Sequence, residues 1–187
     1  MKKISAFIAA LATLFVVSQA SALSPPQTFS MSNSSAITSN FSGFQATLSS
    51  VAPPVASPDG GNAAKVLRSS GSVFTIDTFS TLFPAFPYTY SCVSAYVRAG
   101  SASSVGKTSR LFARERTPAG ALVGQNSTSV TLSNSWQQVF AYRTMTGAGT
   151  NYMDFYVDLT DSTAGSYFFV DGMHVDGGIV PDPPGSC

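Results

Sequence analysis

The side chains that could perform acid–base chemistry are few in this sequence. The chain contains one histidine, His174, and one glutamate, Glu115. Hydrolysis usually requires two carboxylates, or a nucleophile activated by a neighbouring base. His174 lies in an apolar, strand-like run, which favours a packing or surface role, and Glu115 stands between two arginines, which favours a solvated charge cluster. No zinc-type spacing, phosphate-binding glycine loop or nucleophile elbow occurs, so we predict that the protein is not an enzyme.

A second group of side chains is suited to binding sugars. Residues 152–159 alternate between apolar side chains and a polar stripe of Tyr152, Asp154, Tyr156 and Asp158. Sugar rings are bound by aromatic side chains that cover their C–H faces and by flanking hydrogen-bonding groups. We therefore expect the stripe to face solvent and to present Tyr152, Asp154 and Tyr156 to a carbohydrate. Cross-strand packing is the alternative role for any one of these tyrosines.

A neighbouring strand-like run offers a second aromatic stripe with a cation. Tyr90, Tyr96 and Arg98 recur at even spacing within residues 88–99. They would extend the carbohydrate-binding surface if their strand pairs in the same sheet as residues 151–159.

Four cations precede and occupy another strand-like run. Lys107, Arg110, Arg114 and Arg116 are spaced so that most of them share one face of a strand. Such a row either meets an anionic glycan or protects an exposed sheet edge against aggregation, and the second role is the more common one.

The two cysteines, Cys92 and Cys187, permit one disulfide bond in an oxidising compartment. A bridge between them would close a loop of most of the domain and stabilise the fold by about 4 to 5 kcal/mol. Two alternatives stay open from the sequence. Cys92 would be unremarkable as a buried thiol, and Cys187, as the last residue, would be free to link two copies into a dimer.

Composition limits the choice of partner. The chain has 10 Lys and Arg against 9 Asp and Glu, and charged residues make up 10% of it. Two of the lysines lie in the first three residues, so the remainder is nearly neutral. This balance gives no electrostatic reason to expect nucleic acid or an anionic membrane as partner, and it favours a neutral polar ligand.

The first residues have the pattern of a signal peptide. A basic start at Met1-Lys2-Lys3 is followed by an apolar run to Val17 and by the small-x-small cleavage motif Ala20-Ser21-Ala22. We predict a signal peptide over residues 1–22 and export to the periplasm or the outside of the cell. No later apolar run is long enough to span a bilayer, so we expect a soluble mature protein.

Short β-rich runs, separated by turns of Gly, Pro, Asn and Ser, follow one another through most of the chain. This spacing predicts an all-β, two-sheet antiparallel β-sandwich, a jelly roll, with no long helix. We expect an irregular N-terminal segment over residues 23–43, a sandwich domain over 44–177 and a Pro/Gly-rich tail over 178–187. The predicted strands are 44–51, 63–67, 72–79, 88–99, 108–116, 127–132, 136–143, 151–159 and 166–175.

Several of these runs resemble, in order and spacing, the carbohydrate-binding-module-like jelly rolls of the galactose-binding-like superfamily. The resemblance is carried by residues 94–100 (SAYVRAG), 130–139 (VTLSNSWQQV) and 167–175 (YFFVDGMHV), and by the strand entry PDGGNAAK at 58–65. It implies a jelly roll with a glycan ligand. In that family Trp136 packs on the sandwich, which implies a structural role.

The resemblance also implies a metal. Asp171 corresponds to a structural calcium ligand of many relatives, and Asp59 would be a second ligand. The N-terminal segment that is common in the family is not recognisable in residues 29–44. A carboxylate that caps the turn at Gly172 is the alternative role for Asp171, and a simple turn is the alternative for Asp59.

Two functional hypotheses follow. The first is a secreted, noncatalytic carbohydrate-binding module that recognises a polysaccharide or glycan. The second is a structural or adhesive extracellular surface protein without a sugar ligand, in which the protein is monomeric or forms a dimer through Cys187. Retention on a polysaccharide supports the first hypothesis, and a disulfide-linked dimer supports the second.

Overall fold

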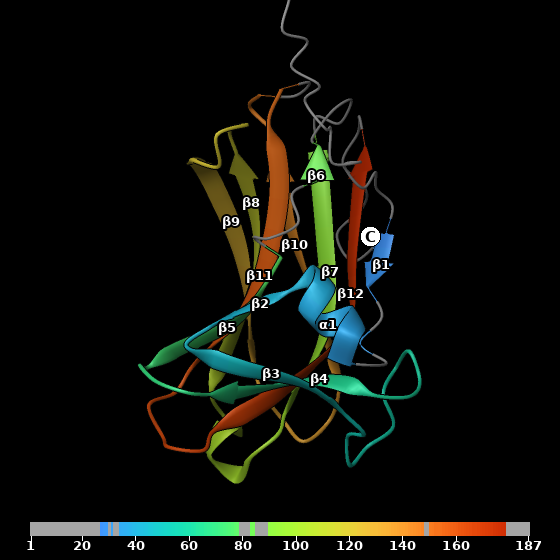
Figure 1. Ribbon diagram of the computed structural model, residues 1–187, viewed down its shortest axis with the longest axis vertical. Helices are drawn as coiled ribbons and strands as arrows, with labels where there is room; N and C mark the ends of the chain where they lie inside the picture. The colour runs from blue at the N-terminus through green and yellow to red at the C-terminus, as the bar shows by residue number, and fades with distance from the viewer. Residues whose placement is uncertain are drawn as a thin grey trace, which may run out of the picture.

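Strands with alternating apolar residues pack in two layers, as the sequence predicts. The computed structural model describes residues 27–29, 31, 34–78, 83–84, 90–147 and 150–178, which form two antiparallel sheets (Figure 1). Alternate side chains of each sheet turn inward, so that the core lies between the layers. The predicted all-β sandwich is confirmed.

Sheet A has six described strands. The path runs β10 (Gln137–Thr144), β7 (Tyr90–Ala99), β12 (Tyr167–Gly178), β4 (Ala63–Arg68) and β3 (Ala46–Val51), and β1 (Gln27–Phe29) pairs with the second half of β12.

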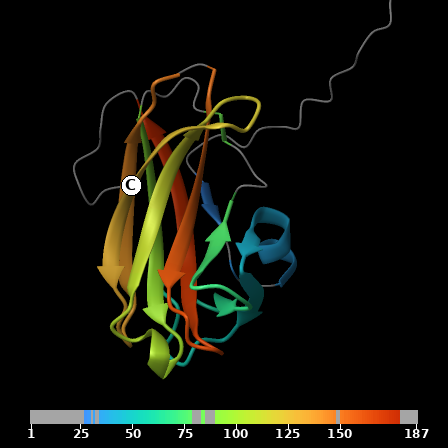
Figure 2. The same cartoon turned by 90° about the vertical axis from the view of Figure 1, so that its left-hand side faces the viewer.

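Sheet B also has six described strands. The path runs β2 (Ser42–Phe44), β5 (Val73–Asp77), β11 (Tyr152–Thr160), β8 (Thr108–Arg116) and β9 (Leu122–Thr131), and β6 (Phe83–Pro84) pairs with β11. Figure 1 shows β9, β8 and β11 side by side, and Figure 2 turns the molecule by 90°.

The period-two pattern of β11 decides which of its side chains enter the core. Met153, Phe155, Val157 and Leu159 are all completely buried, as the alternation predicts. Sheet A contributes the opposing layer through the inward residues of β7 and β12. Those residues include Val93, Ala95, Val97, Phe168, Val170, Met173 and Val175.

The segment 23–43, which we expected to be irregular, contributes to the core. Its described part holds β1, the short helix α1 (Ser34–Asn40) and the start of β2. The Phe29 ring lies 5.4 Å from Phe41 and 6.0 Å from Phe155, and Ile37 is fully buried. These apolar residues are separated by Ser, Thr and Asn without a clear period, which is why the sequence did not reveal them.

A bulge divides β12 into two halves. The register shifts between Asp171 and His174, and Gly172 adopts φ +51°, a conformation that favours glycine. Beyond the bulge, His174 Nδ1 lies 2.8 Å from Thr28 Oγ1 on β1. The single histidine thus helps to join two strands.

Three predictions fall on residues outside the described ones. These are the signal peptide over residues 1–22, the tail over 178–187 apart from Gly178, and the pairing of Cys187. The Cys92–Cys187 bridge and the Cys187 dimer therefore stay predictions. Cys92 itself is buried in β7.

Candidate functional site

The polar stripe of β11 lies on the outer face of sheet B, but only part of it reaches solvent. Tyr152 and Tyr156 are half-buried. Asp154 and Asp158 are 0% and 1% exposed, so the prediction that they face solvent is wrong. The reason is that arginines from β8 cover both carboxylates.

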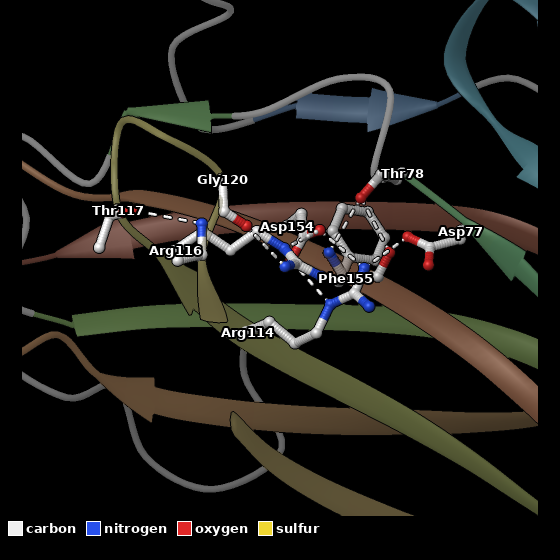
Figure 3. Close-up of polar contacts among 9 residues, drawn as sticks. Asp77, Thr78, Arg114, Arg116, Thr117, Gly120, Asp154 and Phe155 are labelled. Carbon is white, nitrogen blue, oxygen red and sulfur yellow. Dashed lines mark hydrogen bonds and ion pairs between the residues drawn. The ribbon is translucent and has the colours of Figure 1, made fainter. Parts of the chain in front are cut away.

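Asp154 is enclosed by two guanidinium groups (Figure 3). Arg114 donates from Nε to Asp154 Oδ1 at 2.8 Å and from Nη2 to Oδ2 at 2.7 Å, and Arg116 donates from Nε to the same Oδ2 at 2.9 Å. Arg114 also bonds Asp77 on β5, and Arg116 donates to the Gly120 carbonyl oxygen at 2.9 Å. These contacts hold the guanidinium groups of β8 and the carboxylates of β5 and β11 in one fixed arrangement.

Asp158 forms a second pair with Arg110. Arg110 Nε lies 3.1 Å from both carboxylate oxygens, and the Arg110 backbone N–H donates to Oδ1 at 3.2 Å. The side-chain hydrogen bond to Asp158 raises the pKa of Arg110. Burial raises the pKa of Asp158, and the bonds from Arg110 oppose that rise. Because the guanidinium stays protonated, Arg110 is a fixed and partly exposed hydrogen-bond donor whose charge is balanced by Asp158.

The tyrosine that we expected to stack on a sugar instead stacks within the protein. The Tyr156 ring lies 4.3 Å from the Phe112 ring at an interplanar angle of 7°, and the guanidinium carbon of Arg114 lies 4.3 Å from its centroid. These neighbours use the π surface of Tyr156, which leaves its edge and hydroxyl for a ligand. Burial raises the pKa of this phenol, so it keeps its proton at neutral pH.

The arginine row does not lie at a sheet edge. β8 pairs with β11 on one side and with β9 on the other, and Arg110, Arg114 and Arg116 are each paired with an aspartate. Neither the edge-protecting role nor an unpaired cationic row fits these three residues.

Glu115 points away from that row, and the expectation of a solvated charge is wrong. Its carboxylate is fully buried and accepts hydrogen bonds from Arg143, Thr146, Gly147 and Asn151. Burial acts to raise the pKa of Glu115, but these bonds outweigh it and hold the pKa at about 2. Glu115 therefore anchors Arg143, Thr146, Gly147 and Asn151 and is closed to a substrate.

Tyr90, Tyr96 and Arg98 lie on the other side of the molecule. β7 belongs to sheet A and β11 to sheet B, so the two stripes face opposite ways and the predicted extended surface is wrong. Tyr96 is half-buried, Tyr90 stacks on Tyr142 at 5.8 Å, and Arg98 is 6% exposed.

An exposed aromatic residue that the sequence did not single out completes the outer face of sheet B. Phe44 on β2 is 59% exposed. The register places it opposite Thr75, Thr75 opposite Asp158 and Asp158 opposite Arg110. Directly opposed residues share a face, so one row crosses the sheet from Phe44 to Arg110 over three strand spacings, about 14 Å. Phe44 lies in a region without periodicity, and its exposure depends on where β2 pairs.

The two proposed calcium ligands lie together on the outer side of sheet A. The Asp59 backbone N–H donates to Asp171 Oδ2 at 3.3 Å, and a Cβ at Gly172 would lie 2.8 Å from Asp59 Oδ2. Burial raises the pKa of Asp171 to about 6, and the negative charge of Asp59 adds to this rise. Among the described residues no group of three or more His, Cys, Asp or Glu side chains is placed to hold a metal.

Within the described part of the chain, no helix has the length and apolar character needed to cross a membrane.

Comparison with solved structures identifies the same sandwich in proteins that act on or bind carbohydrate. The CBM22-1 xylan-binding domain of Paenibacillus barcinonensis Xyn10C aligns with a TM-score of 0.56 at 12% identity, over 87% of this chain and 100% of that chain. Arabinose-bound MgGH51 α-L-arabinofuranosidase aligns with a TM-score of 0.57 at 20% identity, over 81% of this chain and 24% of that chain.

A third solved structure concerns the promiscuous specificity of carbohydrate-binding modules from the β-sandwich superfamily. It aligns with a TM-score of 0.54 at 14% identity, over 72% of this chain and 55% of that chain. The chain thus spans about a quarter of the arabinofuranosidase and the whole of the xylan-binding domain. A scan of protein-family models and a search of curated proteins each found no match. At these identities the comparisons establish the fold, which is that of carbohydrate-binding-module jelly rolls.

Proposed function

We propose that the protein is a secreted, noncatalytic glycan-binding module that holds a neutral polysaccharide on the outer face of sheet B. The observation that carries this proposal is the cross-strand row that joins the exposed Phe44 ring to the fixed Arg110 guanidinium. An exposed aromatic ring covers the C–H face of a sugar, and a held guanidinium donates to its hydroxyls.

The polar groups of this face are already ordered before a ligand arrives. Arg110, Arg114 and Arg116 are each held by an aspartate, and the exposed side chains of Gln125 and Ser127 stand beside them on β9. Binding then costs little side-chain entropy, since the donors do not have to be immobilised. The same pairing supports a noncatalytic role, because Asp77, Asp154 and Asp158 are engaged by arginines rather than available as acid and base.

Affinity electrophoresis of the mature protein in gels that contain neutral polysaccharides tests the proposal. We expect retardation by at least one of them. Phe44→Ala and Arg110→Gln should each weaken it, whereas Val105→Ala, which truncates another exposed apolar side chain outside both sheets, should leave it unchanged.

Two results would overturn the proposal. One is binding that survives both Phe44→Ala and Arg110→Gln. The other is the absence of retention on every polysaccharide tested, which would favour the structural or adhesive hypothesis.

The calcium expectation is a second, separate proposal. Asp59 and Asp171 bring two carboxylates together, and a hard cation prefers such oxygens with further ligands from backbone carbonyls. A bound ion would supply charge that neutralises the buried Asp171 and would tie the loop before β4 to β12. A calcium-dependent rise in the melting temperature that Asp171→Asn removes supports this role.

A further inference from the structure

The outer face of sheet A carries two cations, Lys65 and Arg98, that have no carboxylate partner among the residues that the structure describes. Phe169 of β12 lies opposite Lys65 of β4 on one side and opposite Arg98 of β7 on the other. No ion pair of Lys65 or Arg98 within 4.0 Å occurs among the described residues, in contrast to the arginines of β8. Two unneutralised cations therefore flank one aromatic side chain.

Three aromatic side chains, Phe169, Tyr167 and Trp136, form the surface beside these cations, here called the aromatic floor. Tyr167 and Trp136 lie 5.6 Å and 6.4 Å from the Phe169 ring. Phe169 is 3% exposed, whereas Tyr167 and Trp136 are half-buried and reach solvent. Lys65 Nζ lies 4.2 Å from the Tyr167 centroid, so the cation and the accessible ring are adjacent.

Arg98 is held in place with part of its hydrogen-bonding capacity unused. Its Nε donates to the Asn134 carbonyl oxygen at 2.7 Å, and its Nη1 donates to the Ala99 carbonyl oxygen at 3.0 Å. The third nitrogen, Nη2, makes no hydrogen bond within the described residues. The Arg98 guanidinium carbon also lies 5.9 Å from the Phe169 ring centroid. This guanidinium is 6% exposed, and within the described part of the chain its hydrogen bonds go only to carbonyl oxygens, so its burial is not offset there by an opposite charge. An anionic ligand group would supply one.

The loop between β3 and β4 forms a wall beside this floor. Trp136 Nε1 donates to the Val55 carbonyl oxygen at 3.3 Å, and Asp59 contacts Asp171, so the loop passes over the outer face of sheet A. Asp171 accepts from this loop and forms no ion pair with Lys65 or Arg98. The loop thus borders the site, and its contact with Asp171 does not neutralise Lys65 or Arg98.

We propose that this face is a second saccharide site that takes the carboxylate of an acidic sugar, a hexuronate unit of an acidic polysaccharide. The carboxylate lies between Lys65 and Arg98, whose backbones are two strand spacings, about 10 Å, apart. The sugar ring packs against Tyr167 and Trp136. With a formal net charge of only +1, the protein has no general attraction for polyanions, so such binding requires a local site.

Polygalacturonate is the acidic polysaccharide used to test this site, and fully methyl-esterified polygalacturonate is the uncharged control. In affinity electrophoresis we expect retardation by the first polymer and loss of it with the second. Lys65→Gln should weaken binding about fivefold, as expected for one partly exposed charge pair. Lys107→Gln removes the same charge from an exposed position near β8 and should change nothing.

Trp136→Ala is a second variant that removes part of the floor and keeps every charge. It should also weaken retention by polygalacturonate, with thermal melting used to confirm that it folds. Phe44→Ala should leave acidic-polymer binding intact, which separates this site from the neutral-glycan face. The proposal is overturned by three results: no retardation of the wild type at low ionic strength, equal losses in Lys65→Gln and Lys107→Gln, or loss of acidic-polymer binding in Phe44→Ala.

Discussion

The two outer faces of the sandwich treat their charges in opposite ways. On sheet B, three arginines of β8 are matched by three aspartates: Arg110 pairs with Asp158, and Arg114 and Arg116 pair with Asp154 and Asp77 between them. On sheet A, Lys65 and Arg98 flank Phe169, and neither has a carboxylate partner within the described part of the chain. One face pairs its cations with carboxylates, and on the other the described residues give Lys65 and Arg98 carbonyl and aromatic contacts instead.

Strand register explains this difference. In sheet B, Arg110 and Arg114 of β8 lie directly opposite Asp158 and Asp154 of β11, so each pair forms across one ladder. In sheet A the central residue of the corresponding row is Phe169, which offers its neighbours no negative charge. The residue types along one cross-strand row thus decide whether the cations of a face meet a carboxylate or an aromatic ring.

The largest expected effect on stability comes from removing an arginine that pairs with carboxylates on the outer face of sheet B. Arg114→Met should lower the free energy of unfolding by about 3–5 kcal/mol, because it removes a partner from the buried Asp154 and from Asp77. Lys65→Met on the outer face of sheet A should change the free energy of unfolding by less than about 0.5 kcal/mol. Urea unfolding of both variants measures this contrast. Equal losses would show that pairing is not what distinguishes the two faces.

Glu115 gives the next effect, with a defined pH dependence. Its pKa is held at about 2 in the folded protein, below the ordinary value of 4.5, so its contribution is present above pH 4.5 and is lost as the pH falls towards 2. Glu115→Gln should therefore cost about 2–3 kcal/mol at neutral pH and progressively less below pH 4.5. Parallel urea titrations of wild type and variant at several pH values measure the difference. A constant difference across that range would contradict the assignment.

The contribution of Asp171 to stability should depend on pH in the opposite direction. Its folded pKa of about 6 lies above the ordinary value of 3.8, so the folded state is favoured below pH 3.8 and loses stability as the pH rises through 6. In a chelating buffer at pH 8, Asp171→Asn should raise the free energy of unfolding by about 1–2 kcal/mol, and at pH 3.5 it should not. Added calcium should stabilise the wild type and leave the variant unaffected. If the variant is destabilised at pH 8 in chelator, the carboxylate has a partner that the described residues do not reveal.

The smallest effect concerns two tyrosine hydroxyls, one on each face. Neither Tyr156 nor Tyr96 makes a side-chain hydrogen bond within the described residues, so replacing either with Phe should change stability by less than about 0.5 kcal/mol. Tyr156→Phe should nevertheless weaken neutral-glycan binding about threefold, the value of one hydrogen bond to a ligand. Tyr96→Phe should not. Isothermal titration with an oligosaccharide of the retained polysaccharide compares them, and similar affinities would exclude the Tyr156 hydroxyl from the binding face.

The sequence located most strands well because their period-two patterns are local. The prediction 108–116 coincides with β8, and 151–159 differs from β11 by one residue at each end. The prediction 127–132 missed the first half of β9, whose Gly, Gln and Asn residues resemble a loop. The burial of Glu115 was also readable in principle, because it is two residues from Ala113 and shares its inward face.

The candidate sites were only partly predictable. That Tyr152 and Tyr156 point away from the core follows from alternation, but the covering of Asp154 depends on arginines some forty residues earlier in the chain. The contribution of Phe44 depends on the pairing of β2 with β5, and the separation of Tyr96 from Tyr156 depends on which sheet each strand joins. None of these pairings can be predicted from the local sequence of one strand.

By itself, the sequence determined that this chain forms short amphipathic strands in two layers, and which side chains of each strand turn inward, since both follow from alternation along the backbone. Only the tertiary structure decided which charges meet. Ladder register brings together residues that are far apart in the chain, and the energy of a charge depends on the group placed opposite it.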